Sequence, residues 1–371
     1  MTTSRSPVTR RALAAALCTA IAACAPTMSQ TTTGSAPGPS SVSPDASWPV
    51  STREHVDLWL HGYALLTGDT ARVPFFKRGY RQTMRQVKSS RGAYTQLDAN
   101  ADQLSARFRV NPALVNGQFL PFYFSSFQQM QQVTDLFLQT GGDPRSTNDP
   151  LTRQLFAVLG STYASGPDRD WLRLFVQSLA DENTRFYQAY WTSEQANRAA
   201  TRQAVDSVWQ SVYRPKLQRF LNNTQQNNGE LILSLPLDGE GRTIAYSKQQ
   251  NSVAVGFPDA PAQAVEAVYV LAHEVVNAIT TTAINDNITP TEQRTGVGAR
   301  YTANASVRAG AVLLQRAAPE LASDYMRYYL RAAGITPPTG DPSSLFTSTF
   351  AIPDAIRDAF TRQIEVVLGG I

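Results

Sequence analysis

Cysteine and histidine are scarce in this sequence. Of its 371 residues, 2 are cysteines and 3 are histidines, and both cysteines, Cys18 and Cys24, lie near the N-terminus. The rest of the chain holds no thiol, which excludes a disulfide framework, a thiolate zinc site, an iron–sulfur cluster and a cysteine nucleophile there. Chemistry that depends on imidazole has only His55, His61 and His273 to draw on.

Several common signatures of catalysis are also missing. The sequence has neither of the glycine-rich phosphate-binding loops, Gly-x-x-x-x-Gly-Lys-Ser/Thr and Gly-x-Gly-x-x-Gly, and it has no Gly-x-Ser-x-Gly nucleophile elbow. A strong excess of one charge is missing as well. The chain has 33 basic and 29 acidic residues, but without the three arginines of the first 23 residues, 33 − 3 = 30 basic side chains face 29 acidic ones. Net charge therefore gives no argument for nucleic acid as a partner.

The first 24 residues have the pattern of an export signal. Arg10 and Arg11 precede an apolar run, Ala12 to Ala23, which is too short to cross a hydrocarbon core of ~30 Å. The sequence Ile21-Ala22-Ala23-Cys24 resembles the lipobox of bacterial lipoproteins. By that resemblance, residues 1–23 are a signal peptide, and Cys24 carries acyl chains such as palmitate that anchor the protein to a lipid bilayer. The alternative is an ordinary cleaved signal with an incidental cysteine.

Residues 24–48 are expected to form a flexible tether between the lipid and a folded body. They are mostly Ser, Thr, Pro, Gly and Ala, with Asp45 as their one charge, and such a segment cannot bury enough apolar surface to fold. Ala25 stands where, by the same resemblance, an aspartate would favour retention in the inner membrane. We therefore expect the bacterial cell envelope, with the outer membrane favoured and the folded part in the periplasm or at the surface.

Residues 49–228 are predicted to be helical. Ser51 and Glu54 have the spacing of a capping box, which would open a helix that stops near Gly68. Apolar spacings of three and four residues and glycine stops predict further helices over 124–138, 151–163, 170–190 and 193–221.

Residues 229–371 are predicted to combine a small sheet with helices. Three short strands are expected at 231–237, 242–246 and 252–257. Four helices follow, over 261–281, 292–316, 319–333 and 353–368, the first opened by Asp259 as its cap. This order of elements predicts an α+β, mostly helical fold with a small antiparallel sheet of about three strands.

One constellation carries chemistry, His273-Glu274-Val275-Val276-Asn277. In zinc peptidases with the motif His-Glu-x-x-His, the residues at i and i+4 of a helix bind one ion and the glutamate is the general base. With the strands before it and the long helix after it, the segment from about 230 to 315 resembles the zincin metallopeptidases. The resemblance implies zinc held by His273 and Asn277, with Glu274 as the catalytic base. Because asparagine replaces the second histidine and residues 293–319 contain no acidic residue, we expect a degenerate site.

Polar residues surround this motif on two predicted helices. They recur at intervals of three or four and so share a face of each helix: Glu266, Tyr269, His273 and Asn277 on the first, and Tyr301, Asn304 and Arg308 on the second. If these faces meet, they form either a cleft for a peptide or protein partner or a buried hydrogen-bond network that joins two helices. His55 and His61, six residues apart, lie ~120° apart on a helix and form no local chelate.

Two other groups of residues are assigned to structure. Tyr325, Tyr328 and Tyr329 fit the packing face of a helix, and the basic stretch from Lys77 to Arg81 is predicted to be a solvated face.

The sequence therefore indicates a membrane-anchored envelope lipoprotein with a metallopeptidase-like, degenerate site. The alternative is a non-catalytic binding or scaffold lipoprotein. The hydrolase hypothesis requires His273 to be open to solvent, whereas the alternative predicts His273 hydrogen-bonded to protein.

Overall fold

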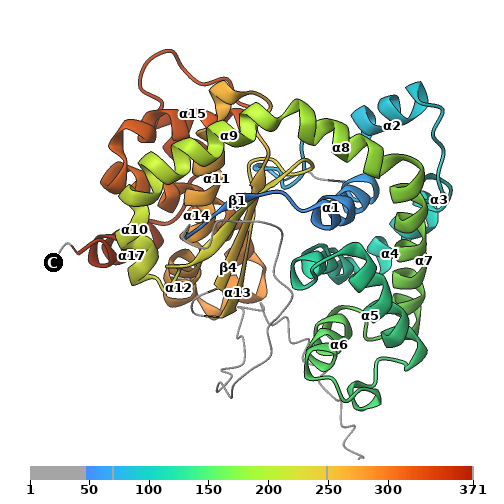
Figure 1. The fold of residues 1–371 in the computed structure, drawn as a ribbon. Coiled ribbons are helices and arrows are strands. Elements are labelled where there is room, and N and C mark those ends of the chain that lie inside the picture. The colour runs from blue at the N-terminus through green and yellow to red at the C-terminus, as the bar shows by residue number, and fades with distance from the viewer. Residues whose placement is uncertain (1–46, 69–70, 248–249, 370–371) are drawn as a thin grey trace, which may run out of the picture. The chain divides into compact units, whose positions relative to one another are not determined.

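The computed structural model describes residues 47–68, 71–247 and 250–369, all within one unit of the chain, Gly34–Ile371 (Figure 1). The predicted signal peptide, Cys24 and the predicted tether up to Ala46 lie outside the described residues. Trp48, the last residue of that tether, differs from the prediction, because it is fully buried and its indole Nε1 donates to the carbonyl oxygen of Gln226 at 2.9 Å.

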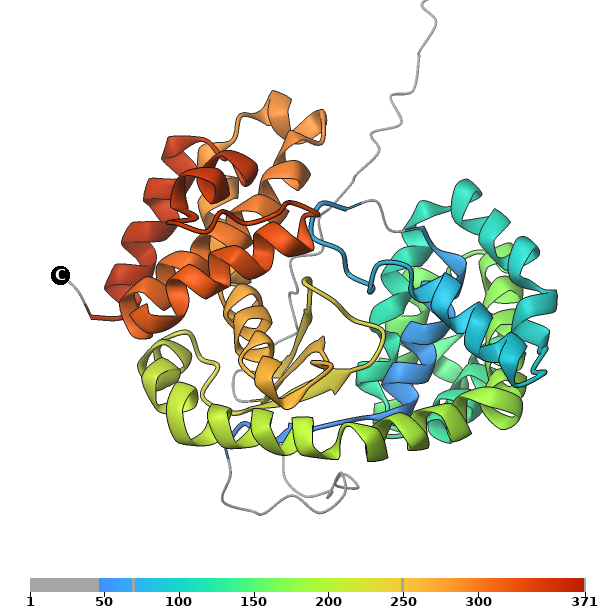
Figure 2. The same ribbon diagram turned by 90° about the horizontal axis from the view of Figure 1, so that it is seen from above.

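A group of helices surrounds α1 (Glu54–Leu66). Nearly every side chain of α1 is buried, since this helix is covered by its neighbours (Figure 2). The elements that follow it are α2 (Tyr80–Ser90), α3 (Gln96–Ala99), α4 (Ala101–Val110), η1 (Pro112–Tyr123), α5 (Phe127–Gln139), η2 (Pro144–Ser146) and α6 (Pro150–Thr162). The helices predicted over 124–138 and 151–163 correspond to α5 and α6.

A nearly continuous helical run joins this group to the sheet (Figure 2). It consists of α7 (Gly166–Glu182), the π-helical turn η3 (Asn183–Tyr187), α8 (Gln188–Asn197), α9 (Ala199–Val208), the π-helical turn η4 (Trp209–Tyr213) and α10 (Arg214–Asn223). The sequence predicts two helices here with a break near 191. The structure places the break at Arg198 instead.

The sheet has four strands and is mixed. The three predicted strands are present, but a fourth joins them and only one of the three pairings is antiparallel, so the predicted antiparallel sheet is wrong in direction. Its strands are β1 (Val50–Ser51), β2 (Gly229–Ser234), β3 (Arg242–Ser247) and β4 (Gln250–Gly256), in the order β1-β2-β4-β3. β1 pairs with β2 in parallel, β2 pairs with β4 in parallel, and β3 pairs with β4 in antiparallel orientation. The reason is topological. The chain leaves β2 for the far edge of the sheet, and the β3–β4 hairpin returns β4 between β3 and β2.

The C-terminal part is helical again, as predicted, with more breaks. Its elements are η5 (Pro261–Gln263), α11 (Glu266–Val275), α12 (Asn277–Asn287), α13 (Pro290–Arg294), α14 (Val297–Ala317), η6 (Pro319–Leu321), α15 (Ala322–Ala332), α16 (Ser343–Thr349) and α17 (Asp354–Val367). The run Pro261–Asn287 is long and apolar enough to cross a membrane, but 78% of its most apolar window is buried within the fold. This run contains the buried helices α11 and α12, of which α11 packs against β4 of the sheet.

Two predicted helix caps are wrong. Ser51 lies in β1, where its hydroxyl donates to Glu230, and α1 begins after Arg53 without a side-chain cap. Asp259 does not cap the helix that follows, because its carboxylate pairs with Lys77 at 2.9 Å and with Arg198 at 2.6 Å. In both cases a contact with residues distant in the sequence has replaced the predicted cap. For Ser51 this contact is strand pairing and Glu230, and for Asp259 it is two ion pairs.

The sheet separates two hydrophobic clusters. Leu231, Leu233 and Val253 pack into the cluster of the C-terminal helices, whereas Ile232 and Ala254 pack into the cluster around α1. This alternation follows the two-residue period of a strand and buries both faces of the sheet. Residues 205–221 of the run α9–α10 belong to the first cluster, so packing crosses the predicted boundary at 228. The α+β, mostly helical class is confirmed.

Candidate functional site

The predicted catalytic pair lies in the interior of the protein. His273 and Glu274 belong to α11 and are 4% and 2% exposed. His273 Nδ1 lies 3.0 Å from Glu274 Oε1, so the two side chains are hydrogen-bonded to each other. Burial acts to raise the pKa of Glu274, but the hydrogen bond and the charge of His273 lower it below its usual value. The carboxylate is therefore held in its charged form by its own neighbour.

The second oxygen of Glu274 is engaged as well. Oε2 accepts from Thr243 Oγ1 on β3 at 3.1 Å and from Asn277 Nδ2 at 3.2 Å. Asn277 Oδ1 accepts in turn from Ser306 Oγ on α14 at 2.8 Å. The predicted helix over 261–281 is broken at Val276, so Asn277 begins α12 instead of continuing the face of His273. Asn277 thus joins two helices through hydrogen bonds on both sides of its amide.

Ring and backbone packing closes the space around His273. Its imidazole stacks on Tyr329 of α15, with ring centroids 5.5 Å apart and 23° between the planes. Gly310 of α14 approaches so closely that a Cβ there would lie 3.3 Å from His273 Cα. Tyr329 is fully buried, as is Tyr325 beside it, which agrees with the packing face predicted for the tyrosines.

The donor set around this pair does not fit zinc. A zinc site needs three or four His, Cys, Asp or Glu donors that converge on one point, and among the described residues no group of three such side chains is placed to hold a metal ion. The two donors present face each other, and the Asn277 oxygen is taken by Ser306. Among the described residues, no second and third donor is therefore placed beside His273 to complete a zinc site.

The two polar faces beside the motif contact different elements. On α11, Glu266 pairs with Arg331 at 3.3 Å and Tyr269 packs edge-on against Tyr325. On α14, Asn304 Nδ2 donates to the carbonyl oxygen of Ala351 at 3.0 Å, and Arg308 Nη1 donates to that of Thr347 at 3.4 Å. Tyr301, half-buried, packs against the C-terminal cluster. These contacts join the two faces to other elements instead of to each other. Helix α14 reaches the motif through Gly310, which lies against His273, and through Ser306, which bonds to Asn277 of α12.

Glu266 does line a cleft, on another side of α11. A cavity of about 360 Å³ lies beyond the carboxyl ends of β2 and β4, where ligands commonly bind to parallel sheets. Three basic and three acidic side chains line it, and two ion pairs join four of them, Lys77 with Asp259 and Arg331 with Glu266. Burial raises the pKa of Glu266, and Arg331 opposes this effect. The cleft is thus polar and internally neutralised.

The other two histidines are also hydrogen-bonded. His55 Nε2 lies 2.9 Å from the carbonyl oxygen of Phe124, and burial, with the charge of Arg53, lowers the pKa of His55 to about 4. His61 is fully buried, with Nδ1 3.0 Å from Tyr80 Oη and Nε2 3.0 Å from Glu182 Oε1. These two imidazoles and His273 do not converge on one site.

A cluster that the sequence does not indicate lies around Glu182. This glutamate, at the end of α7, is 0% exposed and pairs with Lys88 of α2 at 2.7 Å. Thr95 donates to the same carboxylate, and Asp98 pairs with Lys88 at 2.6 Å. These residues come from three helices up to 94 positions apart, so no local spacing in the sequence could have indicated the cluster.

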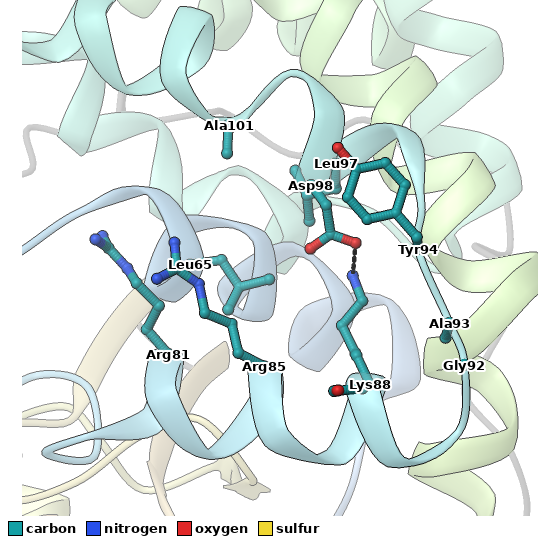
Figure 3. A pocket seen from close by; sticks show the side chains of 11 residues that line it. Leu65, Arg81, Arg85, Lys88, Gly92, Ala93, Tyr94, Leu97, Asp98 and Ala101 are labelled. Atoms are coloured by element: carbon teal, nitrogen blue, oxygen red, sulfur yellow. Dashed lines mark ion pairs between the residues drawn. The ribbon is translucent and has the colours of Figure 1, made fainter.

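Lys88 also contributes to a second cavity, of about 550 Å³ (Figure 3). This cavity, which we call the α2 pocket, is bounded by α2, by the turn through Gly92–Tyr94, by α3 and by the start of α4 at Ala101, with Leu65 of α1 behind. Figure 3 shows Arg81 and Arg85 side by side on α2, and Lys88 further along it bonded to Asp98.

Comparison of the chain with protein-family models, with curated proteins and with solved structures finds no match.

Proposed function

We propose that this chain is a lipid-anchored lipoprotein of the bacterial cell envelope whose folded part binds a ligand or partner without hydrolysing it. The observation that carries the non-catalytic half of this proposal is the bond between His273 and Glu274. A general base must reach the proton that it removes, directly or through one water. Glu274 is buried, and both of its oxygens accept hydrogen bonds from protein side chains.

The metallopeptidase hypothesis needs a different arrangement of the same residues. Its metal ligand and its base would have to face a common open point. The pair instead joins α11 to β3 through Thr243 and, by way of Asn277 and Ser306, to α14. Of the predicted polar faces, only His273 and Asn277 take part, and their partners Thr243 and Ser306 lie outside those faces. The arrangement favours the alternative in which His273 is hydrogen-bonded to protein.

The non-catalytic half is tested with zinc and with Glu274→Gln. We expect the purified full chain to carry no stoichiometric zinc and its melting temperature to be the same with zinc, with chelator and with neither. Glu274→Gln should lower the melting temperature, because the buried His273 loses its anionic partner, while the control Glu365→Gln changes an exposed pair and should not. One bound zinc per chain that is lost in Glu274→Gln or His273→Ala would contradict this half of the proposal.

The anchor is tested with the two cysteines of the chain as a matched pair. In a bacterium fed with a palmitate analogue, Cys18→Ser should still be labelled and recovered with the membranes. Cys24→Ser should be unlabelled and should leave the membrane fraction, because the protein then has no acyl chains to hold it in the bilayer. Labelling of Cys24→Ser equal to that of Cys18→Ser would refute the lipobox assignment.

A further inference from the structure

The α2 pocket lies in the most basic part of the chain. Between Thr70 and Leu97 the sequence holds seven basic residues and no acidic one: Arg72, Lys77, Arg78, Arg81, Arg85, Lys88 and Arg91. The sequence alone predicts a solvated face for part of this stretch. In the structure, the contacts of each of these side chains differ.

Most of these charges are compensated within the fold. Lys77 pairs with Asp259, and Lys88 pairs with Glu182 and Asp98. Arg91 lies over the rings of Phe186 and Tyr190, 5.7 and 5.9 Å from their centroids. Arg72 and Arg78 donate to backbone carbonyl oxygens of Thr349 and Ala332, respectively.

Arg81 and Arg85 remain without an anionic partner among the described residues. Arg81 Nη2 donates to the carbonyl oxygen of Thr67 at 2.8 Å, and Arg85 is exposed. The two lie one turn apart on α2, where like charges repel each other. Burial, followed by the charge of Arg85, lowers the pKa of Arg81. Two uncompensated guanidinium groups thus share one wall of a cavity (Figure 3).

The rest of the lining is mixed. The ion pair of Lys88 with Asp98 and the hydroxyl of Ser89 are polar, and the remaining surface is mostly apolar. Leu65 lies beside the two arginines, and Leu97 and Ala101 complete the apolar surface, with the ring of Tyr94, 68% exposed, at the rim (Figure 3). A cavity of about 550 Å³ lies within the size range of small-molecule sites, which combine apolar walls with a few polar groups that fix the ligand.

We propose that the α2 pocket binds an organic phosphate monoester, with its phosphate group between Arg81 and Arg85 and its apolar part against Leu65 and Leu97. Guanidinium groups donate paired hydrogen bonds that match phosphate oxygens. A phosphate monoester carries ≈ −1.5 to −2 charge at pH 7, which matches the two positive charges of Arg81 and Arg85 that have no anionic partner within residues 47–68, 71–247 and 250–369. Lys88 adds no third charge, since Glu182 and Asp98 already neutralise it.

This inference rests on the proposed binding function but not on the lipid anchor or on the His273–Glu274 network. The phosphate could belong to a soluble metabolite or to the headgroup of a lipid. Both sources are probed by calorimetric titration of the purified full chain, with phenyl phosphate for the first and dihexanoyl phosphatidic acid below its micelle concentration for the second. Inorganic phosphate serves as the probe without an apolar part.

We expect saturable binding of phenyl phosphate that is tighter than binding of inorganic phosphate. Arg85→Ala should raise the Kd roughly 10-fold or more, because it removes charge-assisted hydrogen bonds. Arg109→Ala removes the same charge from an exposed position on α4 outside the pocket and should leave the Kd unchanged. Tighter binding of phosphatidic acid than of phenyl phosphate assigns the ligand to lipids, and the reverse assigns it to soluble metabolites.

A second pair of variants adds a charge instead of removing one. Ser89→Glu places a carboxylate in the lining one turn after Arg85 and should weaken binding of phenyl phosphate. Gln86→Glu adds the same charge to α2 outside the lining and should weaken it less. Three results would overturn the proposal: no saturable binding of either organic phosphate, no preference for them over inorganic phosphate, or equal losses in Arg85→Ala and Arg109→Ala. The zinc and palmitate tests have separate readouts, so failure here is distinguishable from failure of the proposed function.

Discussion

Replacing Glu182 by glutamine tests how much the buried ionic cluster stabilises the helical group. The Glu182 carboxylate receives His61 Nε2 at 3.0 Å, Lys88 Nζ at 2.7 Å and the hydroxyl of Thr95. Burial alone would raise the pKa of Glu182, but the hydrogen bond and charge of His61, and then those of Lys88, bring it from 4.5 to about 2. The charged form of Glu182 is therefore more stable, relative to its protonated form, in the folded protein than in the unfolded chain.

Two estimates give the free energy of unfolding that Glu182→Gln should remove. A pKa lower by 4.5 − 2 = 2.5 corresponds to ~3 kcal/mol of stability above pH 4.5. Removal of one partner of a buried ion pair costs about 3–5 kcal/mol. Asp98 remains 2.6 Å from Lys88 in the variant and is partly exposed, so we expect the lower end, ~3 kcal/mol, in the free energy of unfolding.

Urea unfolding followed by circular dichroism at several pH values measures this difference. Because the folded pKa of Glu182 lies below the unfolded one, the stabilisation is fully present above pH 4.5 and is lost as the pH falls towards 2. The two proteins should thus differ most near pH 6 and converge in acid. Glu365→Gln, which changes an exposed pair with Arg316, should cost less than ~1 kcal/mol at every pH. A Glu182→Gln loss as small as that of the control would refute the reasoning.

Two further predictions concern α1 and α14. Asp57 is fully buried, and burial raises its pKa from 3.8 to about 7, although Ser234 donates to it at 2.6 Å. The pKa of Asp57 is higher in the folded than in the unfolded protein, so the free energy of unfolding of the wild type should fall as the pH rises from 4 through 7. In urea titrations at several pH values, Asp57→Asn should flatten this slope. Equal slopes for the two proteins would contradict the assignment. A Cβ at Gly310 would lie 2.2 Å from Tyr325 Oη, so Gly310→Ala should cost about 1–3 kcal/mol. Gly160→Ala on α6, where nothing lies within 4 Å, should be neutral or stabilising, and equal unfolding midpoints for the two variants would exclude the predicted clash.

The helices that the sequence predicts correctly have strong signals at both ends and along one face. The helix predicted over 353–368 is α17 (Asp354–Val367), with Ile356, Phe360 and Ile364 buried at intervals of four. By contrast, the sequence does not predict α2. This helix buries Tyr80, Met84 and Lys88, one of them charged, and apart from Val87 the rest of it is polar, so its apolar period is too weak to identify.

The sheet illustrates a different limit. β-branched and apolar residues predict the three longer strands, but such residues do not specify a partner. β1 has only two residues, Val50 and Ser51, and is a strand because Pro49 accepts from Leu231 N–H and the two segments pair in parallel. Nothing within a two-residue segment distinguishes it from a linker.

The candidate site is half predictable. Adjacent His273 and Glu274 are visible in the sequence, and so is the asparagine that follows His273 by four residues. Their partners are not, because Thr243 lies 31 residues before Glu274 and Ser306 lies 29 after Asn277. The break at Val276 also changes the geometry, since an i, i+4 pair shares a face only on an uninterrupted helix. The sequence thus identifies the residue types, and tertiary contacts change their role.

Glycine backbones explain why this pair is enclosed instead of open. A Cβ at Gly241, just before β3, would lie 2.9 Å from Glu274 Cγ and 2.6 Å from the carbonyl oxygen of Ala254, and one at Gly310 would lie 3.3 Å from His273 Cα. The backbone at Gly241 therefore approaches Glu274 from the sheet, and the backbone at Gly310 approaches His273 from α14. Both approaches are so close that only glycine fits. Replacing Asn277 by histidine would restore the motif without opening the site, because the obstruction is made by β3 and α14 and not by residue 277.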